Sequence, residues 1–214
     1  MDGPADHWDA VYTTKATDDV SWFQSEPVTS LRLLRTWARP GGSVVDVGAG
    51  TSPLVDRLVE AGRDDVTLLD VSTEALDAVR RRLGDRAGAV RFAVADVRTW
   101  NPRRTFDVWH DRAVFHFLVD PADRQAYVDQ ASAAVAPGGM VVLATFAADG
   151  PTSCSGLPTA RYDAAALTAL FAPAFALEHA ERQEHVTPWG TVQPFTWVVF
   201  PTGRGRTPLI PLPH

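Results

Sequence analysis

The stretch that decides the fold reads Val44-Val45-Asp46-Val47-Gly48-Ala49-Gly50-Thr51-Ser52. Its first four residues are mostly β-branched and favour a short buried strand. Gly48 and Gly50 then allow a tight turn and a close approach of the backbone to a ligand. Ser52, followed by Pro53, is typical of the first residues of a helix. The stretch therefore predicts a strand, a glycine turn and a helix in direct succession.

The same alternation of patterns continues on both sides of this stretch. Apolar residues recur at helical spacing between most of the strand-like runs, and Pro-Gly-Gly sequences at 40–42 and 137–139 end two of the helices. Strands alternating with helices predict a parallel sheet covered on both faces. We expect strands at 43–47, 66–69, 90–94, 106–110, 140–146, 175–186 and 195–200. The helical faces are Leu31, Leu34 and Ala38; Leu54, Leu58 and Ala61; Leu76, Val79 and Leu83, capped by Ser72; Tyr127, Ala131 and Val135; and Leu167, Leu170 and Phe171, beginning at Asp163.

The last two strands have no helical pattern between them, so we expect an antiparallel hairpin around residues 187–190. The fold class is therefore α/β: a seven-strand, Rossmann-like, doubly wound sheet with a C-terminal antiparallel hairpin. We divide the chain into an aromatic N-terminal lid segment at 1–26, an α/β domain at 27–200 and a Pro-rich tail at 201–214. We expect poor order from Gly203 onward.

Composition limits the number of domains, the kinds of partner and the location that we expect for the protein. The 214 residues suit one α/β domain, and the net charge of −6 argues against a nucleic-acid partner. One cysteine allows no intrachain disulfide, and with six scattered histidines it makes no metal motif. No apolar run approaches a membrane span, and the first nine residues do not resemble a signal peptide. We expect a cytoplasmic monomer or homodimer that binds no metal, membrane or nucleic acid.

Two acids follow the next strands of the predicted sheet. Asp70 ends the second strand, twenty residues after Gly50, where a carboxylate can accept hydrogen bonds from both hydroxyls of a ribose. Asp96 follows the third strand, where an acceptor can reach an adenine amino group. Glycines and an acid at such places can also serve only turns and helix caps. The order of strand, glycine turn, helix, strand-Asp, helix and strand-Asp favours ligand binding.

The kind of nucleotide follows from two residues. A dinucleotide-binding loop needs a third glycine where this chain has Pro53. Asp46 places an acid inside the first strand, which suits a ligand with an ammonium or sulfonium group better than a pyrophosphate. These residues argue against an NAD-dependent oxidoreductase.

The segment 46–51 resembles the signature loop of class I S-adenosylmethionine-dependent methyltransferases, whose sheet also ends in an antiparallel hairpin. Asp70, Asp96 and Ala136-Pro137-Gly138-Gly139 match later landmarks of that family, so the resemblance spans about 27–200. It implies S-adenosylmethionine as cofactor and places His110 and Asp111 in the methyl-transfer pocket. The cofactor residues that it implies are Asp46, Gly48, Ala49, Gly50, Asp70, Val71, Asp96, Val97 and His110.

The segment 110–117 resembles the Asp-Arg segment of small-molecule methyltransferases, including thiol and thiopurine enzymes. We take His116, Asp111 and His110 as catalytic candidates. His116 is either a general base, with an ordinary pKa of about 6.5, or a packed side chain bound to the backbone. Arg112 either holds an anionic substrate or pairs with a nearby Asp, and we favour the pairing.

The N-terminal segment is dense in aromatic residues for a polar stretch. We expect Trp22 and Phe23 to form a lid over the sulfonium, since aromatic faces attract cations, and Trp8 and Tyr12 to pack on the sheet edge. Residues 150–158 are expected to form one wall of the pocket, and the hairpin tip can bring His185, Trp189 and Gln193 to it. The expected substrate contacts are Trp22, Phe23, Arg112, His116 and His185.

The resemblance implies methylation of a small molecule at sulfur, a related chalcogen or nitrogen. The thiol-enzyme likeness favours sulfur, in which case no general base is needed. Two alternatives stay open. One is a methyltransferase acting on protein lysine, which an open acidic groove would favour. The other is a non-catalytic module that binds the cofactor.

Overall fold

The computed structural model describes residues 3–203. Its elements in chain order are α1 (Pro4–Thr14), α2 (Val28–Trp37), β1 (Val44–Val47), α3 (Leu54–Glu60), β2 (Val66–Asp70), α4 (Thr73–Leu83), the 3-10 turn η1 (Gly84–Ala89), β3 (Val90–Val94), β4 (Phe106–Arg112), the 3-10 turn η2 (Phe115–Phe117), α5 (Pro121–Ala134), β5 (Val135–Phe146), β6 (Ser153–Cys154), β7 (Leu157–Pro158), α6 (Ala164–Phe171), β8 (His179–Val186) and β9 (Val192–Pro201).

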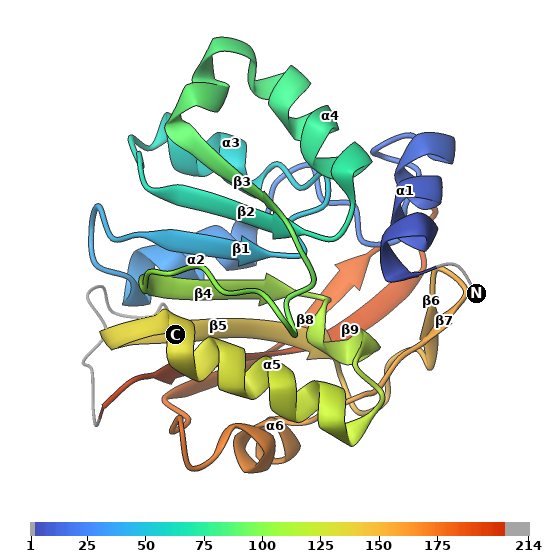
Figure 1. Ribbon diagram of the computed structural model, residues 1–214. Coiled ribbons are helices and arrows are strands. Elements are labelled where there is room, and N and C mark those ends of the chain that lie inside the picture. The colour runs from blue at the N-terminus through green and yellow to red at the C-terminus, as the bar shows by residue number, and fades with distance from the viewer. Residues whose placement is uncertain (1–2, 204–214) are drawn as a thin grey trace.

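Seven strands form one sheet in the order β3-β2-β1-β4-β5-β9-β8 (Figure 1). Strands β3, β2, β1, β4 and β5 are parallel. Strand β9 runs antiparallel to both β5 and β8. The predicted fold class, with its C-terminal antiparallel hairpin, is confirmed.

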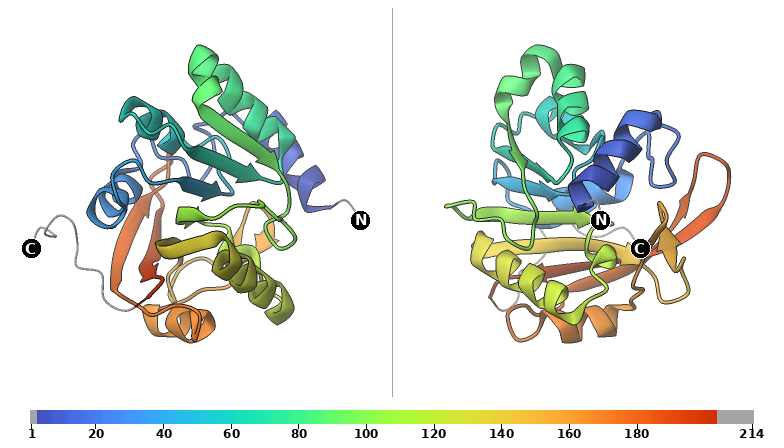
Figure 2. Two further views of the ribbon diagram at one scale, coloured as in Figure 1. Left: turned by 60° about the vertical axis from the view of Figure 1, so that its left-hand side comes forward. Right: turned by 45° about the vertical axis from the view of Figure 1, so that its right-hand side comes forward.

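Helices bury apolar side chains against both faces of the sheet. Leu33 of α2, Leu58 of α3 and Leu76 of α4 belong to one buried cluster. Tyr127 of α5 and Leu167 of α6 belong to the other. Figure 2 shows α5 and α6 on the face opposite α4. Because both faces are covered, β1, β2 and most of β5 are buried along their length.

The sheet order reverses between β1 and β4, which leaves a crevice beyond the carboxyl ends of these strands. Three further segments lie at this end of the sheet: α1, the β6–β7 hairpin and the tip of the β8–β9 hairpin (Figures 1 and 2). The topology thus brings the N-terminal and C-terminal parts of the chain to one place.

Local polar residues set the starts of the helices. The Ser72 hydroxyl accepts a hydrogen bond from the amide of Ala75 and caps α4, as predicted. The Asp163 carboxylate caps α6 in the same way. Helix α3 begins at Leu54, one residue later than expected, although the Ser52 hydroxyl does accept from the Leu54 amide at 3.2 Å.

The sequence placed Phe175 in a strand, and the structure corrects this. Strand β8 begins at His179. The amide of Phe175 donates instead to the carbonyl of Phe171, at the end of α6, and its ring is buried beside Phe171. Phe175 is apolar because it packs under the helix end, not because it belongs to the sheet.

Two strands also extend beyond their predicted ends. Val135 was expected on a helix, but it pairs with Phe106 in the sheet and opens β5. Strand β4 continues to Arg112 rather than ending at His110, so Asp111 lies within the strand. Residues 150–158, which the sequence indicates as a loop, contain the short β6–β7 hairpin.

The lid segment at 1–26 contains α1, and β9 continues one residue past 200. The part of the tail at 204–214 lies outside the described residues. Within residues 3–203, no helix combines the length and apolarity needed to cross a bilayer.

Candidate active site

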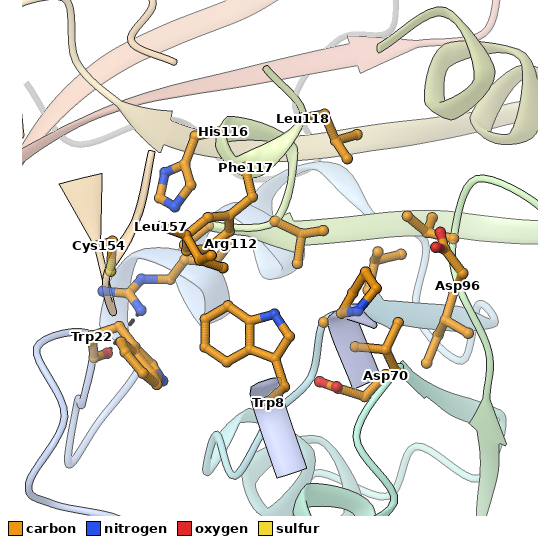
Figure 3. A pocket seen from close by; sticks show the side chains of 18 of the residues that line it. Trp8, Trp22, Asp70, Asp96, Arg112, His116, Phe117, Leu118, Cys154 and Leu157 are labelled. Carbon is orange, nitrogen blue, oxygen red and sulfur yellow. Dashed lines mark hydrogen bonds between the residues drawn. The ribbon is translucent and has the colours of Figure 1, made fainter. Parts of the chain in front are cut away.

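A cavity of about 230 Å³ opens beyond the carboxyl ends of the parallel strands, under α1. Figure 3 shows two regions of it. We call the region around Asp70, Val71, Asp96 and Val97 the strand-end half. The aromatic half is lined by Trp8, Trp22, Arg112, His116, Phe117, Phe146, Cys154, Leu157, Gln193 and Phe195.

The glycine turn after β1 needs both of its glycines. Gly48 and Gly50 have φ angles of 61° and 51°, in the left-handed region that favours glycine. A Cβ on Gly48 would lie 1.9 Å from a methyl carbon of Val114, and one on Gly50 would lie 2.3 Å from the hydroxyl of Tyr12. In this structure the close neighbours that exclude a side chain are therefore protein atoms.

The amides of the glycine turn are already used within the protein. Those of Gly48 and Ala49 donate to the carbonyl of Leu69, at 2.7 and 3.2 Å. The amide of Gly50 donates to the Asp70 carboxylate at 2.8 Å. A pyrophosphate needs such amides free, so this turn does not fit a dinucleotide.

Asp70 lies at the end of β2 and faces the strand-end half of the cavity. Its second oxygen accepts from the amide of Ser72 at 2.8 Å. Burial raises the pKa of Asp70 to about 6. Each carboxylate oxygen accepts one amide and keeps a lone pair free, so the pair can accept two vicinal hydroxyls.

Asp96 is held in place by Arg98. The guanidinium of Arg98 donates to both oxygens of Asp96 and also to Asp123 at 2.8 Å. Arg98 holds the pKa of the Asp96 carboxyl below its usual range. Asp96 and the buried Val97 thus form a rigid edge of the cavity.

Asp46 and His110 form a buried pair between β1 and β4. They lie opposite each other in the parallel ladder, and Nδ1 of His110 lies 2.7 Å from the Asp46 carboxylate. The other ring nitrogen lies 2.9 Å from the Ser30 hydroxyl. The pair faces a narrow second cleft along the glycine turn, which Phe23 also lines.

Asp111 points away from His110, because neighbouring residues of a strand face opposite sides of a sheet. Its carboxylate accepts hydrogen bonds from the amides of Val114 and Phe115, at 2.8 and 3.1 Å, and from the hydroxyl of Tyr127 at 2.5 Å. Burial raises the pKa of Asp111 to about 6. Asp111 lines neither the cavity nor the narrow cleft. The structure therefore does not place it with the other catalytic candidates.

His116 lies in the aromatic half with no exposed surface. Its Nδ1 accepts the Phe146 amide at 3.3 Å, whereas Nε2 has no partner among the described residues. Burial, with a contribution from Arg112, lowers the pKa of His116 to about 3. A neutral ring that accepts at Nδ1 carries its proton on Nε2. Near neutral pH this group donates a hydrogen bond to the cavity rather than taking a proton from it.

Arg112 is the buried cation of the aromatic half. It donates to the Trp22 carbonyl at 2.9 Å, and its guanidinium carbon lies 5.0 Å from the centre of the Phe195 ring. No carboxylate of residues 3–203 forms an ion pair with it, so the expected pairing with an Asp is wrong. Burial lowers the pKa of Arg112 to about 10, which leaves the side chain charged at neutral pH.

Helix α1 faces the cavity, contrary to the expectation that it packs on the sheet edge. The Trp8 ring lies 5.2 Å from that of Phe117 and 5.8 Å from that of Trp22, centre to centre. Tyr12 also lines the cavity, whereas Phe23 faces the narrow cleft and the surface.

Asp9 attaches α1 to the start of α4. Its carboxylate accepts from the Ser72 hydroxyl at 2.6 Å and from the Glu74 amide at 3.2 Å. Sequence reasoning missed Asp9, because its partners lie more than sixty residues further along the chain. It also missed Phe146 and Phe195, which look like ordinary core residues of strands.

Of the three residues of the C-terminal hairpin that were expected at the pocket, one lines the cavity. Gln193 lines the aromatic half. His185 lies outside it and donates to the Ser21 carbonyl at 2.7 Å, which fastens the N-terminal segment to the hairpin. Trp189 is largely exposed. Leu157 and Cys154 do form a wall of the cavity, as expected for their loop.

Cys154 shows no sign of activation, since burial raises the pKa of its thiol. Within residues 3–203, no three His, Cys, Asp or Glu side chains are grouped so that they could hold a metal ion.

A sheet of this order, with a glycine turn after its first strand and an acid at the end of its second, defines the class I methyltransferase fold. The family model described as a methyltransferase domain matches residues 44–139. Residues 44–139 thus match this domain model, and the chain has the fold of the class I S-adenosylmethionine-dependent methyltransferases.

Among curated proteins, a trans-aconitate 2-methyltransferase of Rhizobium leguminosarum bv. trifolii is 32% identical over 100 residues, 46% of this chain and 36% of the relative. The chain spans half or less of the length of the curated relatives it matches.

Two solved structures share the fold over most of the chain. One, from a study of the conversion of a disulfide bond into a thioacetal group in echinomycin biosynthesis, has a TM-score of 0.75 and 20% identity, covering 94% of this chain and 92% of that one. The other is the 1,6-didemethyltoxoflavin-N1-methyltransferase of Burkholderia thailandensis, with 1,6-didemethyltoxoflavin and S-adenosylhomocysteine bound. It has a TM-score of 0.64 and 21% identity, covering 90% and 80%.

Proposed function

We propose that this protein transfers a methyl group from S-adenosylmethionine to a small-molecule nucleophile. The observation that carries the proposal is one continuous cavity. Its strand-end half offers the Asp70 and Asp96 carboxylates, and its other half is an aromatic chamber closed by α1. When bound, the cofactor supplies an electrophilic methyl group on a sulfonium.

The chain's own residues fit the parts of this cofactor. Asp70 can accept the two ribose hydroxyls, while Asp96, Val71 and Val97 border the place of the adenine. The narrow cleft along Gly48, Ala49 and Gly50, with the Asp46–His110 pair at its base, suits the methionine part.

The substrate residues act by positioning and by exclusion of water. The ring edges of Trp8, Trp22 and Phe117 close the chamber around an acceptor, and a dry chamber strengthens every electrostatic contact inside it. His116 donates a hydrogen bond from Nε2. We propose Trp22, Arg112 and His116 as acceptor contacts, and His185 as a residue that holds the lid rather than the acceptor.

A small acceptor fits the chamber better than a lysine side chain of a protein. The buried charge of Arg112 repels a lysine ammonium group. An open groove beside the chamber does carry Asp18, Glu26 and Glu184. Two of these acids are ion-paired, Glu26 with Arg57 and Glu184 with Arg182, which weakens the groove's attraction for a basic peptide.

A screen with labelled S-adenosylmethionine tests the proposal. The acceptors are thiols, selenols, amines, phenols, carboxylic acids and a protein extract. We expect label in small molecules, with sulfur, a related chalcogen or nitrogen as the accepting atom. Label only in protein would favour the lysine alternative, and calorimetric binding of S-adenosylhomocysteine without any turnover would favour a non-catalytic module.

Binding of NAD in place of S-adenosylhomocysteine would end the proposal altogether. We further propose a cytoplasmic monomer or homodimer without a nucleic-acid partner, because the chain is acidic and has a single cysteine. Sedimentation with and without added DNA checks the last two points.

A further inference from the structure

Four buried polar atoms of the aromatic half have no hydrogen-bond partner among the described residues. They are Nε and Nη2 of Arg112, Nε2 of His116 and Oε1 of Gln193. The three side chains come from β4, η2 and β9, so no single local irregularity explains them. In Figure 3 the guanidinium of Arg112 and the ring of His116 lie at the same end of the cavity.

A buried cation without a counter-charge is unfavourable for an isolated fold. Buried charges in proteins are normally paired, and buried donors are normally hydrogen-bonded. The acid that lines the narrow cleft beside Arg112 is Asp46, but its carboxylate is bonded to His110. The pattern is that of a site whose missing partner is a ligand.

The two free nitrogens of Arg112 define the shape of that ligand. Nη1 is bonded to the Trp22 carbonyl, and the guanidinium lies against the Phe195 ring, so the side chain is held from two sides. The remaining Nε and Nη2 share one edge of the planar guanidinium. Two parallel donors on such an edge match the two oxygens of a carboxylate.

The walls around this edge are flat and apolar. Phe195 lies beneath the guanidinium, the Phe146 ring stacks on His116 at 4.4 Å, and the rings of Trp8 and Phe117, in contact with each other, also line the cavity. A planar, unsaturated molecule would therefore bury its faces, while its charged edge meets Arg112.

We propose that the acceptor is a small planar anion whose carboxylate, or a group of like shape and charge such as a thiocarboxylate, binds side-on to Arg112 and accepts a hydrogen bond from His116. This inference rests on the proposed methyl transfer and names the substrate class of the same site. Gln193 supplies the neighbouring acceptor for an N–H or O–H of the same molecule.

The methionine part of the cofactor also carries a carboxylate, so the same chemistry has two sources. Arg112 lines both the narrow cleft and the aromatic half, whereas His116 and Gln193 line the aromatic half and not the cleft. The acceptor is favoured because the unpaired atoms of all three side chains can meet one ligand only in the aromatic half, where Figure 3 shows Arg112 across the cavity from Asp70 and Asp96. The experiment separates the two sources.

The test is calorimetry on the full chain saturated with S-adenosylhomocysteine. The probes are benzoate, thiobenzoate and phenylacetate, with benzamide as the neutral analogue. We expect at least one anion to bind at least about tenfold more tightly than benzamide, the scale of a hydrogen bond to a charged group. Arg112→Met should weaken that anion by about 10–100-fold, and Arg112→Lys by less.

Arg103→Met is the matched control, since it removes the same charge from an exposed side chain and should change nothing. The inference is overturned if none of the three anions binds the wild-type complex, or if binding persists in Arg112→Met. It is also overturned if Arg112→Met weakens S-adenosylhomocysteine but not 5′-methylthioadenosine, because the guanidinium would then serve the cofactor's carboxylate. A wild-type protein that binds no S-adenosylhomocysteine would instead refute the proposed function.

Discussion

The two halves of the cavity differ in how their polar groups are satisfied. In the strand-end half, Asp70 accepts two backbone amides and Asp96 is clamped by Arg98, within one continuous stretch of chain. In the aromatic half, Arg112 and His116 keep donors unpaired, and their neighbours come from both ends of the sequence. One half is complete before any ligand binds, while the other is completed by its ligand. Substitutions in the two halves should therefore fail in different ways.

The largest effect should come from removing the lid. Deletion of residues 1–24 takes away Trp8 and Trp22 and opens the aromatic half to water. We expect kcat/KM to fall by about 100-fold or more, the scale of a lost positioning element. The central sheet should persist, since its strands begin at Val44, and far-UV circular dichroism checks this. Full activity of a folded, truncated protein would show that the chamber needs no lid.

A change in the strand-end half should affect the cofactor alone. Asp70→Ala removes the acceptor for two hydroxyls and should weaken S-adenosylhomocysteine by about 1–3 kcal/mol, roughly 5–150-fold. Calorimetry measures this loss, and Asp129→Ala on the exposed side of α5 is the control. Unchanged affinity would mean that the ribose lies elsewhere.

In the aromatic half, the buried His116 makes the stability of the folded protein depend on pH. Burial lowers its pKa from 6.5 to about 3, so below pH 6.5 the unfolded chain binds a proton that the folded protein does not. The contribution of His116 is thus intact above pH 6.5 and is lost as the pH falls toward 3. Over this range the free energy of unfolding falls by up to about 1.4 kcal/mol per pH unit.

His116→Gln should remove this part of the pH dependence. Urea unfolding at pH 7.5, 6.0 and 5.0 should show a smaller loss of stability in the variant than in the wild type, whatever their difference at pH 7.5. Parallel curves would indicate that His116 is protonated in the folded protein, and the general-base hypothesis would regain support.

The smallest effect should come from the attachment of the lid to the strand-end half. Asp9→Ala removes the hydrogen bonds to Ser72 and Glu74 and should destabilise the closed position of the lid by about 1 kcal/mol, the usual contribution of a helix cap. We expect roughly fivefold weaker binding of S-adenosylhomocysteine. Asp19→Ala removes the same charge from an exposed position in the same segment and should leave affinity unchanged. Equal effects of the two variants would refute the attachment.

The sequence by itself determined the doubly wound sheet and the strand-end half. These depend on short-range patterns: apolar runs, a glycine turn, and acids at strand ends whose order along the chain repeats their order in space. Parallel strands bring their carboxyl ends to one edge, so Gly48, Asp70 and Asp96 converge whatever the rest of the chain does.

Only the tertiary structure decided the aromatic half. The end of β4 is one example. Pairing with β5 extends the strand past His110 to Arg112, and this extension, which the strand's own residues do not determine, fixes Asp111 on the face of the sheet opposite His110. Trp22 and Arg112 are 90 residues apart, and nothing local to either encodes that one would hold the other. The isolation of Arg112 from every described carboxylate is likewise a property of packing. A sequence shows which charges exist, but their pairing depends on distances that only the folded chain defines.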